Sequence, residues 1–192
     1  MINVIMAGVL KDENTLVIGD KSINSLPWHI SEELKFFKNI TRNHSVVMGY
    51  NTAKSLKFKA LPNRRNFVVV DEERLVSNHD LNKLYHDDTD MIVISYNQFK
   101  NLLIDYQRYC DTFDQKLFII GGKALLEYTL RSDIKLDHAY ISYINPKFVD
   151  IASIKDPIEI DSKIFHNHFN TCGSAISECY NGEKFNVLHF QR

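Results

Sequence analysis

The chain has 192 residues, of which 44% are hydrophobic and 24% charged, and its formal net charge is −1 at pH 7. This length predicts one domain with a sizeable core, and the composition is too apolar for a disordered protein. A near-neutral charge gives no support to a general nucleic-acid-binding role, because counterion release needs a basic surface.

The cysteines and the apolar segments predict a location. Cys110, Cys172 and Cys179 are odd in number and irregularly spaced, which disfavours a disulfide framework or a zinc site and favours a reducing cytoplasm. No apolar run approaches the roughly 20 residues of a membrane span. The N-terminal segment is short and lacks a basic region, so it predicts a buried strand and not a signal peptide.

Short runs rich in Val and Ile predict buried strands, and the segments between them predict helices. The alternation favours an α/β fold with a mainly parallel sheet and helices on both faces. Asn181-Gly182 is a hairpin signal, so the sheet should be mixed, with an antiparallel C-terminal hairpin formed by residues 171–180 and 184–190. We expect a single domain over residues 1–192, with the polar segment 145–170 as an excursion within it. The expected strands are 2–9, 45–48, 66–70, 91–95, 116–120 and 138–144, and the expected helices are 31–40, 52–56, 97–106 and 123–130.

Glu33 is the strongest candidate for an acid. Ser31 is a good helix N-cap, and Glu32 and Glu33 would then lie in the first turn, where the helix dipole favours negative charge. Both could simply be surface carboxylates. However, Glu33 borders the predicted apolar stripe whereas Glu32 points away, and a partly desolvated carboxyl has a raised pKa and can assist protonation. The stripe consists of Ile30, Leu34, Phe37 and Ile40.

The segment Leu26-Pro27-Trp28 precedes this helix. Pro27 stiffens the entry, and Trp28 offers a large flat face with one N–H donor. A core tryptophan with a hydrogen-bonded indole is the simpler interpretation, and it is compatible with a place beside a site.

Two strand-to-helix turns suit phosphate groups. In the first, Gly49 follows a strand and Asn51 or Thr52 caps a helix, and in the second Gly121-Gly122 leads from a strand into a helix. Free backbone N–H groups at a helix N-terminus bind anions, and most such turns nevertheless bind nothing. Their joint occurrence suggests a ligand with more than one phosphate, such as a dinucleotide.

Arg64 stands just before the expected strand 66–70. An arginine at the mouth of a strand can hold a carboxylate through two parallel hydrogen bonds. A solvated basic turn is an equally good interpretation.

Taken in order, these segments resemble dihydrofolate reductases from the N-terminus to about Leu130. The matching residues are 2–7, Ile18-Gly19, Leu26-Pro27-Trp28, Glu33-Leu34, Phe37-Lys38, Val47-Met48-Gly49, Thr52, Ser55-Leu56, Leu61-Pro62, Arg64 and Ile120-Gly121-Gly122. The resemblance implies hydride transfer from NADPH to 7,8-dihydrofolate, which yields tetrahydrofolate for one-carbon and thymidylate metabolism. The continuation Ala124-Leu125-Leu126 and the long loop before the C-terminal strands look more like phage-encoded members.

The resemblance also implies roles for individual residues. Glu33 would be the acid that contacts the pterin, with Trp28 and Leu26 beside it. Ile18-Gly19 would belong to a mobile loop that closes over the nicotinamide ribose and excludes water. The implied substrate contacts are Ile5, Met6, Ala7, Glu33, Leu34, Phe37, Lys38, Ser55, Leu56, Arg64 (for the glutamate-tail carboxylate), Ile120 and Ser142 (which supports the acid). The implied cofactor contacts are Ala7, Ile18, Gly19, Gly49, Tyr50, Asn51, Thr52, Val69, Val70, Asp71, Ile120, Gly121, Gly122, Lys123, Ala124, Leu125 and Leu126.

Some positions depart from the family pattern. Tyr50 replaces a basic residue near the cofactor phosphates, and Asp71 stands where many members bind the 2′-phosphate of NADPH. An Asp there could prefer a free ribose hydroxyl, although Lys54, Arg74 or Lys123 could compensate. We expect NADPH, not NADH. The loop before Leu26 carries the extra stretch 11–16.

Two other functions are possible on the sequence alone. A pyrimidine reductase of flavin synthesis would share the Gly121-Gly122 turn but would not be expected to combine Trp28, Glu33 and Arg64. A non-catalytic folate- or nucleotide-binding structural component would not need Glu33. We expect a small-molecule substrate, dihydrofolate, with no nucleic acid, membrane or metal involved, and a monomer or homodimer.

Overall fold

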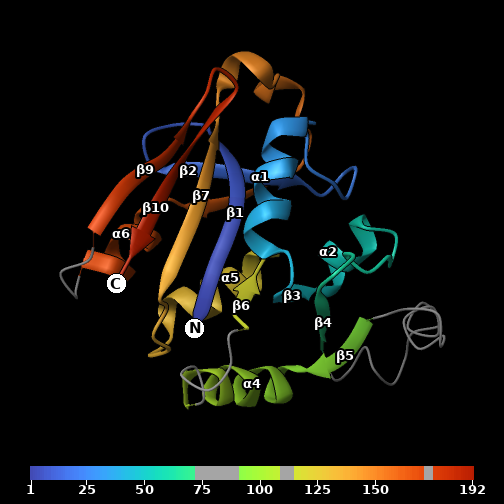
Figure 1. Cartoon of the computed structure of the whole chain (residues 1–192). Coiled ribbons are helices and arrows are strands. Elements are labelled where there is room, and N and C mark those ends of the chain that lie inside the picture. The colour runs from blue at the N-terminus through green and yellow to red at the C-terminus, as the bar shows by residue number, and fades with distance from the viewer. Residues whose placement is uncertain (72–90, 109–114, 171–174) are drawn as a thin grey trace.

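The fold is built on a mixed sheet, seen in a computed structural model that describes residues 1–71, 91–108, 115–170 and 175–192 (Figure 1). Six neighbouring strands are parallel, and two antiparallel strands extend the sheet at the C-terminal edge. This confirms the predicted mixed α/β sheet with its antiparallel C-terminal hairpin. In spatial order the strands are β5 (Met91–Ser95), β4 (Arg65–Val70), β3 (Ser45–Gly49), β6 (Leu117–Ile119), β1 (Ile2–Leu10), β7 (His138–Ile144), β10 (Phe185–Gln191) and β9 (Ala175–Asn181).

A second small antiparallel unit is attached to β1. Strand β2 (Thr15–Asp20) pairs with the end of β1 and also with β8 (Pro157–Asp161). The turn before β2 is held by the Asp12 carboxylate, which accepts hydrogen bonds from the backbone N–H groups of Asn14 and Thr15. The extra stretch 11–16 therefore forms this turn and the start of β2.

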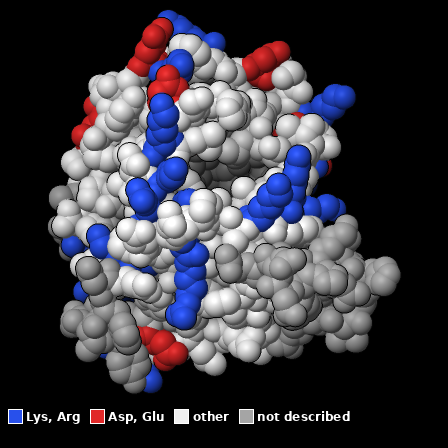
Figure 2. Space-filling view, turned by 45° about the vertical axis from the view of Figure 1, so that its right-hand side comes forward, with Lys and Arg blue, Asp and Glu red and all other residues white. Residues whose placement is uncertain are grey.

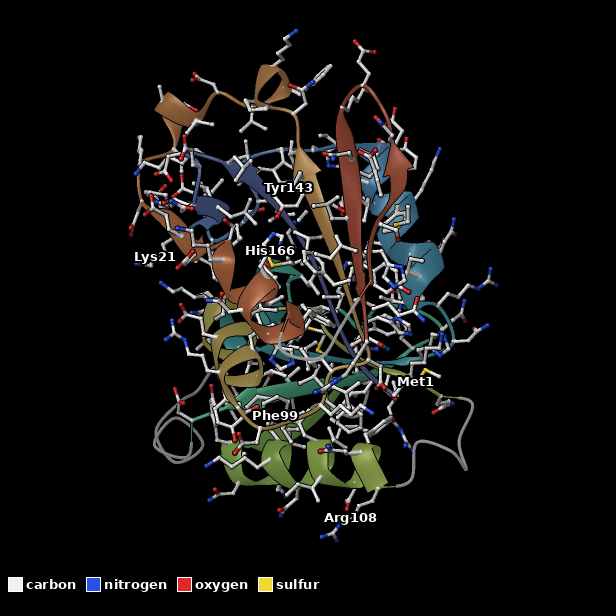
Figure 3. The ribbon with its side chains drawn as sticks, turned by 90° about the vertical axis from the view of Figure 1, so that its left-hand side faces the viewer. Met1, Lys21, Phe99, Arg108, Tyr143 and His166 are labelled. Carbon is white, nitrogen blue, oxygen red and sulfur yellow. The ribbon has the colours of Figure 1, made fainter. Side chains whose placement is uncertain are left out.

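Helices cover both faces of the sheet. Helices α1 (Ser31–Thr41) and α2 (Tyr50–Ser55) lie on one face. Helices α4 (Tyr96–Arg108), α5 (Lys123–Arg131) and α6 (Lys163–Asn170) pack on the other, where Phe99 and Phe165 are fully buried. Figure 3 looks onto this second face, with His166 labelled on α6 and Phe99 on α4.

The predicted elements are found with small shifts at their ends, but two predicted helix caps were wrong. Ser31 is the first residue of α1, and the cap position is Ile30, without a side-chain cap. Likewise, α2 begins at Tyr50 with Gly49 at the cap position, so neither Asn51 nor Thr52 caps it. The polar excursion 145–170 contains two short 3-10 helices (Pro146–Phe148 and Ile151–Ser153), β8 and α6. Within the described residues, no helix is long and apolar enough to cross a membrane.

Candidate active site

A cavity of about 680 Å³ lies between α1 and α2 and continues over the carboxyl ends of β3, β4 and β6. This edge is where open parallel sheets bind ligands, because the strand order changes there. Figure 2 shows the corresponding hollow in the surface. The cavity is lined by the following predicted residues: Ile5, Met6, Ala7, Ile18, Gly19, Leu26, Glu33, Leu34, Phe37, Gly49, Tyr50, Asn51, Thr52, Ser55, Leu56, Val69, Val70, Asp71, Ile120, Gly121, Gly122, Lys123, Ala124, Leu125 and Leu126.

Glu33 is the buried acid of this cavity. Its side chain is only 5% exposed although it lies in the first turn of α1. Burial raises the pKa of its carboxyl, because a desolvated carboxylate loses the water that stabilises its charge. The hydroxyl of Ser142 on β7 opposes this shift, although it forms no hydrogen bond of standard geometry. Glu33 is therefore a carboxyl that holds its proton to a higher pH than an exposed glutamate does.

The orientation of α1 explains why Glu33 points inward. Within the helix, only Glu33 and Thr41 are buried, and Phe36 packs edge-on against Tyr140 of β7. Leu34 is 42% exposed, so the predicted apolar stripe does not lie against the core as a whole. Leu34 instead forms part of the cavity wall, one residue after the acid.

Arg64 is held in place at the outer end of α1. Its Nη1 atom donates a 2.8 Å hydrogen bond to Oγ1 of Thr41, and its Nε atom donates to the carbonyl of Pro62 at 3.2 Å. The guanidinium carbon lies 5.8 Å from the ring centre of Phe37, which lines the cavity. Burial lowers the pKa of Arg64, yet a guanidinium remains charged at any ordinary pH. The arginine is thus a fixed cation beside the cavity.

The two glycine turns lie against each other. The backbone N–H of Gly49 donates to the carbonyl of Gly121 at 2.8 Å. A side chain on Gly49 would stand 3.5 Å from the backbone nitrogen of Gly122, and one on Gly122 would stand 3.5 Å from Oγ1 of Thr52. Gly121 has φ = +119°, a conformation that favours glycine, and the Gly121–Gly122 peptide is cis. The N-termini of α2 and α5 therefore meet at one end of the cavity.

Four predicted residues do not line the cavity. Trp28 is buried against the core, and its indole N–H has no acceptor within the described part of the chain. Ser142 is buried behind Glu33, Lys38 is exposed on α1, and Arg64 stands behind Phe37. Ile18 and Gly19 do line the cavity, but they belong to strand β2 and not to a loop, because β2 pairs with β8 before and after Ile18.

Several wall residues of the cavity were not predicted from the sequence. Tyr96 follows β5 at the same sheet edge as Asp71, and the rule that ligands bind at the carboxyl ends of parallel strands could have found it. Burial raises the pKa of Tyr96, and the nearby charge of Asp71 adds to this shift. Ile158 carried no signal, because it reaches the cavity only through the pairing of β8 with β2. The others are Lys21, Asn24, Ser25, Leu61 and Glu127.

Known proteins resemble this chain over all or most of its length. The family model described as dihydrofolate reductase matches residues 1–192. The dihydrofolate reductase of Ureaplasma parvum is 30% identical over 158 residues, which is 81% of each chain. That of Staphylococcus aureus is 32% identical over 125 residues, or 65% of this chain and 63% of its own. A solved dihydrofolate reductase from Enterococcus faecalis, in complex with NADP(H) and RAB-propyl, has the same fold, with a TM-score of 0.65, 21% identity, and coverage of 100% of this chain and 96% of its own.

Proposed function

The chain belongs to the dihydrofolate reductase family, and from this premise we propose that it reduces 7,8-dihydrofolate to tetrahydrofolate with NADPH, using Glu33 as the acid. The observation that carries the assignment of the acid is the burial of the Glu33 carboxyl in the cavity wall, which raises its pKa. Reduction of a C=N bond needs a hydride on carbon and a proton on nitrogen. A carboxyl whose pKa is raised keeps its proton to a higher pH than an exposed glutamate does, which suits the second requirement.

The chemistry of the walls supports a folate as substrate. Leu34, Phe37 and Leu56 offer apolar surface for a flat ring system between α1 and α2. The charged Arg64 stands at the outer end of this wall, and its planar guanidinium suits a carboxylate. Glu33 lies in the first turn of α1, and Arg64 is bonded to Thr41 at the other end of this helix. The length of α1 therefore separates an acid for the heterocycle from a cation for the tail.

The glycine turns fit a dinucleotide. The close contact of Gly49 with Gly121 and Gly122 leaves room for a ligand against the backbone, where side chains would otherwise stand. We infer that the N-terminus of α5 and the Lys123 side chain hold the pyrophosphate of NADPH, since unpaired N–H groups at a helix start favour anions. When bound, NADPH supplies the hydride. The cavity walls exclude water from the reacting groups, which preserves the raised pKa of Glu33.

Asp71 bears on the choice of cofactor. It is exposed at the end of β4 and lines the cavity, where a negative charge opposes a 2′-phosphate. Lys54 is exposed on α2, and Arg74 lies outside the described residues. We keep NADPH as the proposed cofactor. A monomeric or homodimeric state and a cytoplasmic location also stay predictions.

One assay tests the proposal. The purified chain is mixed with dihydrofolate and NADPH, and the loss of nicotinamide absorbance is followed. We expect turnover that is slower with NADH and that falls about 100-fold or more in Glu33→Ala, because general acid catalysis commonly contributes this much. Retained cofactor binding in the variant shows that the loss is chemical. Absence of turnover by a wild-type protein that binds both ligands refutes the proposed function, and a fully active Glu33→Ala refutes the role of the acid.

A further inference from the structure

Two histidines share a hydrogen bond near the C-terminal edge of the sheet. His138 is the first residue of β7, and His189 lies in β10, the antiparallel neighbour of β7 (Figure 1). Nε2 of His189 stands 3.0 Å from Nδ1 of His138, and the two ring centres are 5.1 Å apart. The bond therefore links the last residues of β10 to the start of β7, and the ends of strands are where a sheet opens most easily.

This hydrogen bond tolerates one added proton but not two. In the neutral pair, one ring nitrogen donates its N–H and the facing nitrogen of the other ring accepts it. A first added proton can bind to a nitrogen outside the bond, so the bond persists. A second one must bind to the accepting nitrogen, and two N–H groups on two charged rings then face each other across 3.0 Å. Protonation of both rings therefore breaks the link.

The surroundings of the pair disfavour its charged forms. Burial lowers the pKa of both His138 and His189, and the charge of His189 lowers the pKa of His138 further. Two other cations act on His138 in the same direction, and one carboxylate opposes them. These groups are Lys116, the N-terminal amine of Met1 and the carboxylate of Asp137. Asp137 already accepts a 2.7 Å hydrogen bond from the backbone N–H of Ile2, so its charge is partly satisfied elsewhere.

Aromatic contacts connect the pair to α1. The ring of Tyr140 on β7 stacks on that of His189, with centres 4.4 Å apart and planes at 2°. Burial raises the pKa of Tyr140, and Cys179 of β9 adds to the shift, so the phenol stays neutral. Tyr140 also meets Phe36 of α1 edge-on, at 6.5 Å between ring centres. Phe36 follows Glu33 by three residues, so the stack supports the helix that carries the acid.

We propose that His138 and His189 form an acid-sensitive latch, which fastens the C-terminal end of β10 to β7 and opens when both rings are protonated. The latch is independent of the proposed function, because it needs no bound ligand. The unfolded chain takes up protons at its histidines below about pH 6.5, whereas the folded chain resists them. The latch therefore stabilises the fold above this pH, and its contribution is lost as the pH falls from about 6.5 through the lowered pKa values.

Variants that keep the hydrogen bond but cannot take up protons test the latch. In His138→Asn/His189→Gln, the amide oxygen of asparagine replaces the accepting Nδ1 and the amide nitrogen of glutamine replaces the donating Nε2. From about pH 7.5 to about pH 5, we expect the unfolding equilibrium constant in urea to rise at least tenfold more in wild type than in this variant. The single variant His189→Gln should show part of the difference. Its matched control is His29→Gln, which removes an exposed histidine and should keep the wild-type pH dependence.

Hydrogen exchange of the backbone amides locates the effect. After correction for the intrinsic pH dependence of exchange, residues 188–191 of wild type should open at least about fivefold more often at about pH 5 than at about pH 7.5. The double variant should not show this change, and the amides of β3, in the parallel part of the sheet, should not show it in either protein. His189→Ala removes the link at every pH, so the same end of β10 should exchange fast already at about pH 7.5.

Three results would overturn the inference. An equal pH dependence of unfolding in wild type and in the double variant would mean that protonation of the pair does not open the latch. Unchanged exchange at residues 188–191 would place the loss of stability elsewhere in the chain. A pH dependence that is reduced as much in His29→Gln as in His189→Gln would assign the effect to histidines in general. If the double variant does not fold, the comparison of His189→Gln with His29→Gln decides.

Discussion

Two opposing effects act on the pKa of the Glu33 carboxyl. Burial in the cavity wall raises its pKa, and the Ser142 hydroxyl acts in the opposite direction. The net result favours the protonated form, so a charge at this position is unfavourable in the folded protein. Binding of a flat ring would remove more water from Glu33 and strengthen the same effect. Glu33 thus lowers the stability of the folded protein at higher pH, but it keeps its proton to a higher pH than an exposed glutamate does.

The pH dependence of the unfolding free energy, compared between wild type and Glu33→Gln, tests this effect of Glu33 on stability. The folded-state pKa of Glu33 is raised, so the native state binds its proton more tightly than the unfolded chain does, and stability is lost as the pH rises from about 4.5 through the raised pKa. Glutamine cannot ionise. We therefore expect Glu33→Gln to become progressively more stable relative to wild type as the pH rises above about 4.5, measured by urea unfolding. Its kcat should be at least 100-fold lower at neutral pH.

The pH dependence of kcat gives a second test of the raised pKa of Glu33. Wild-type kcat should fall as the pH rises through the raised pKa of Glu33, because the acid loses its proton, and the residual rate of Glu33→Gln should lack this step. A difference in stability that does not change with pH would show that Glu33 titrates normally.

The position of a single residue could be predicted only where its neighbours in the sequence determine that position. Helical periodicity placed Glu33 at the border of the apolar stripe, but the N-cap predicted at Ser31 was wrong and Leu34 of that stripe is 42% exposed. The contact between Glu33 and Ser142 could not be derived from periodicity, because it joins α1 to β7 across more than a hundred residues. Only the family resemblance indicated it.

At the level of elements, the site depends on how two turns meet. Each strand–glycine–helix turn was visible in the sequence, but the hydrogen bond from Gly49 to Gly121 arises from the adjacency of β3 and β6, which are far apart in the chain. The two glycines play different parts. Gly121 has a positive φ, whereas Gly49 has φ = −79°, a value open to any residue.

Alanine substitutions should separate these parts. Gly121→Ala forces a side chain into a conformation that L residues rarely adopt, and we expect a loss of about 1–3 kcal/mol in the free energy of unfolding. The affinity for NADPH, measured by fluorescence titration, should fall as well, because the turn lies at the proposed pyrophosphate site. Gly49→Ala needs no unusual backbone and meets only ordinary contacts, so its stability should change by less than about 1 kcal/mol. Equal losses in the two variants would refute the conformational explanation.

At the level of the whole molecule, the two faces of the sheet have different tasks. Helices α1 and α2 border the cavity. Helices α4, α5 and α6 bury large side chains on the opposite face, and the first residues of α4 and α5 also reach the cavity. The parallel strands were predictable because each is a continuous apolar run. In contrast, β2, β8 and α6 were not, since β2 and β8 gain their stability from each other across long stretches of chain and the apolar residues of α6 are interspersed with His and Asn.

The contribution of α6 gives a final prediction for the whole fold. Phe165 is fully buried in the core opposite the cavity, so Phe165→Ala should lower the free energy of unfolding by about 3–5 kcal/mol, measured by urea denaturation. The matched control is Phe148→Ala, because Phe148 is 41% exposed and should cost less than about 1 kcal/mol. Since α6 does not line the cavity, KM for dihydrofolate in the folded Phe165→Ala protein should stay near that of wild type. A KM that rises severalfold while the protein is still folded would mean that the face carrying α6 also shapes the site, and an unfolding free energy close to that of wild type would mean that α6 contributes little to the core.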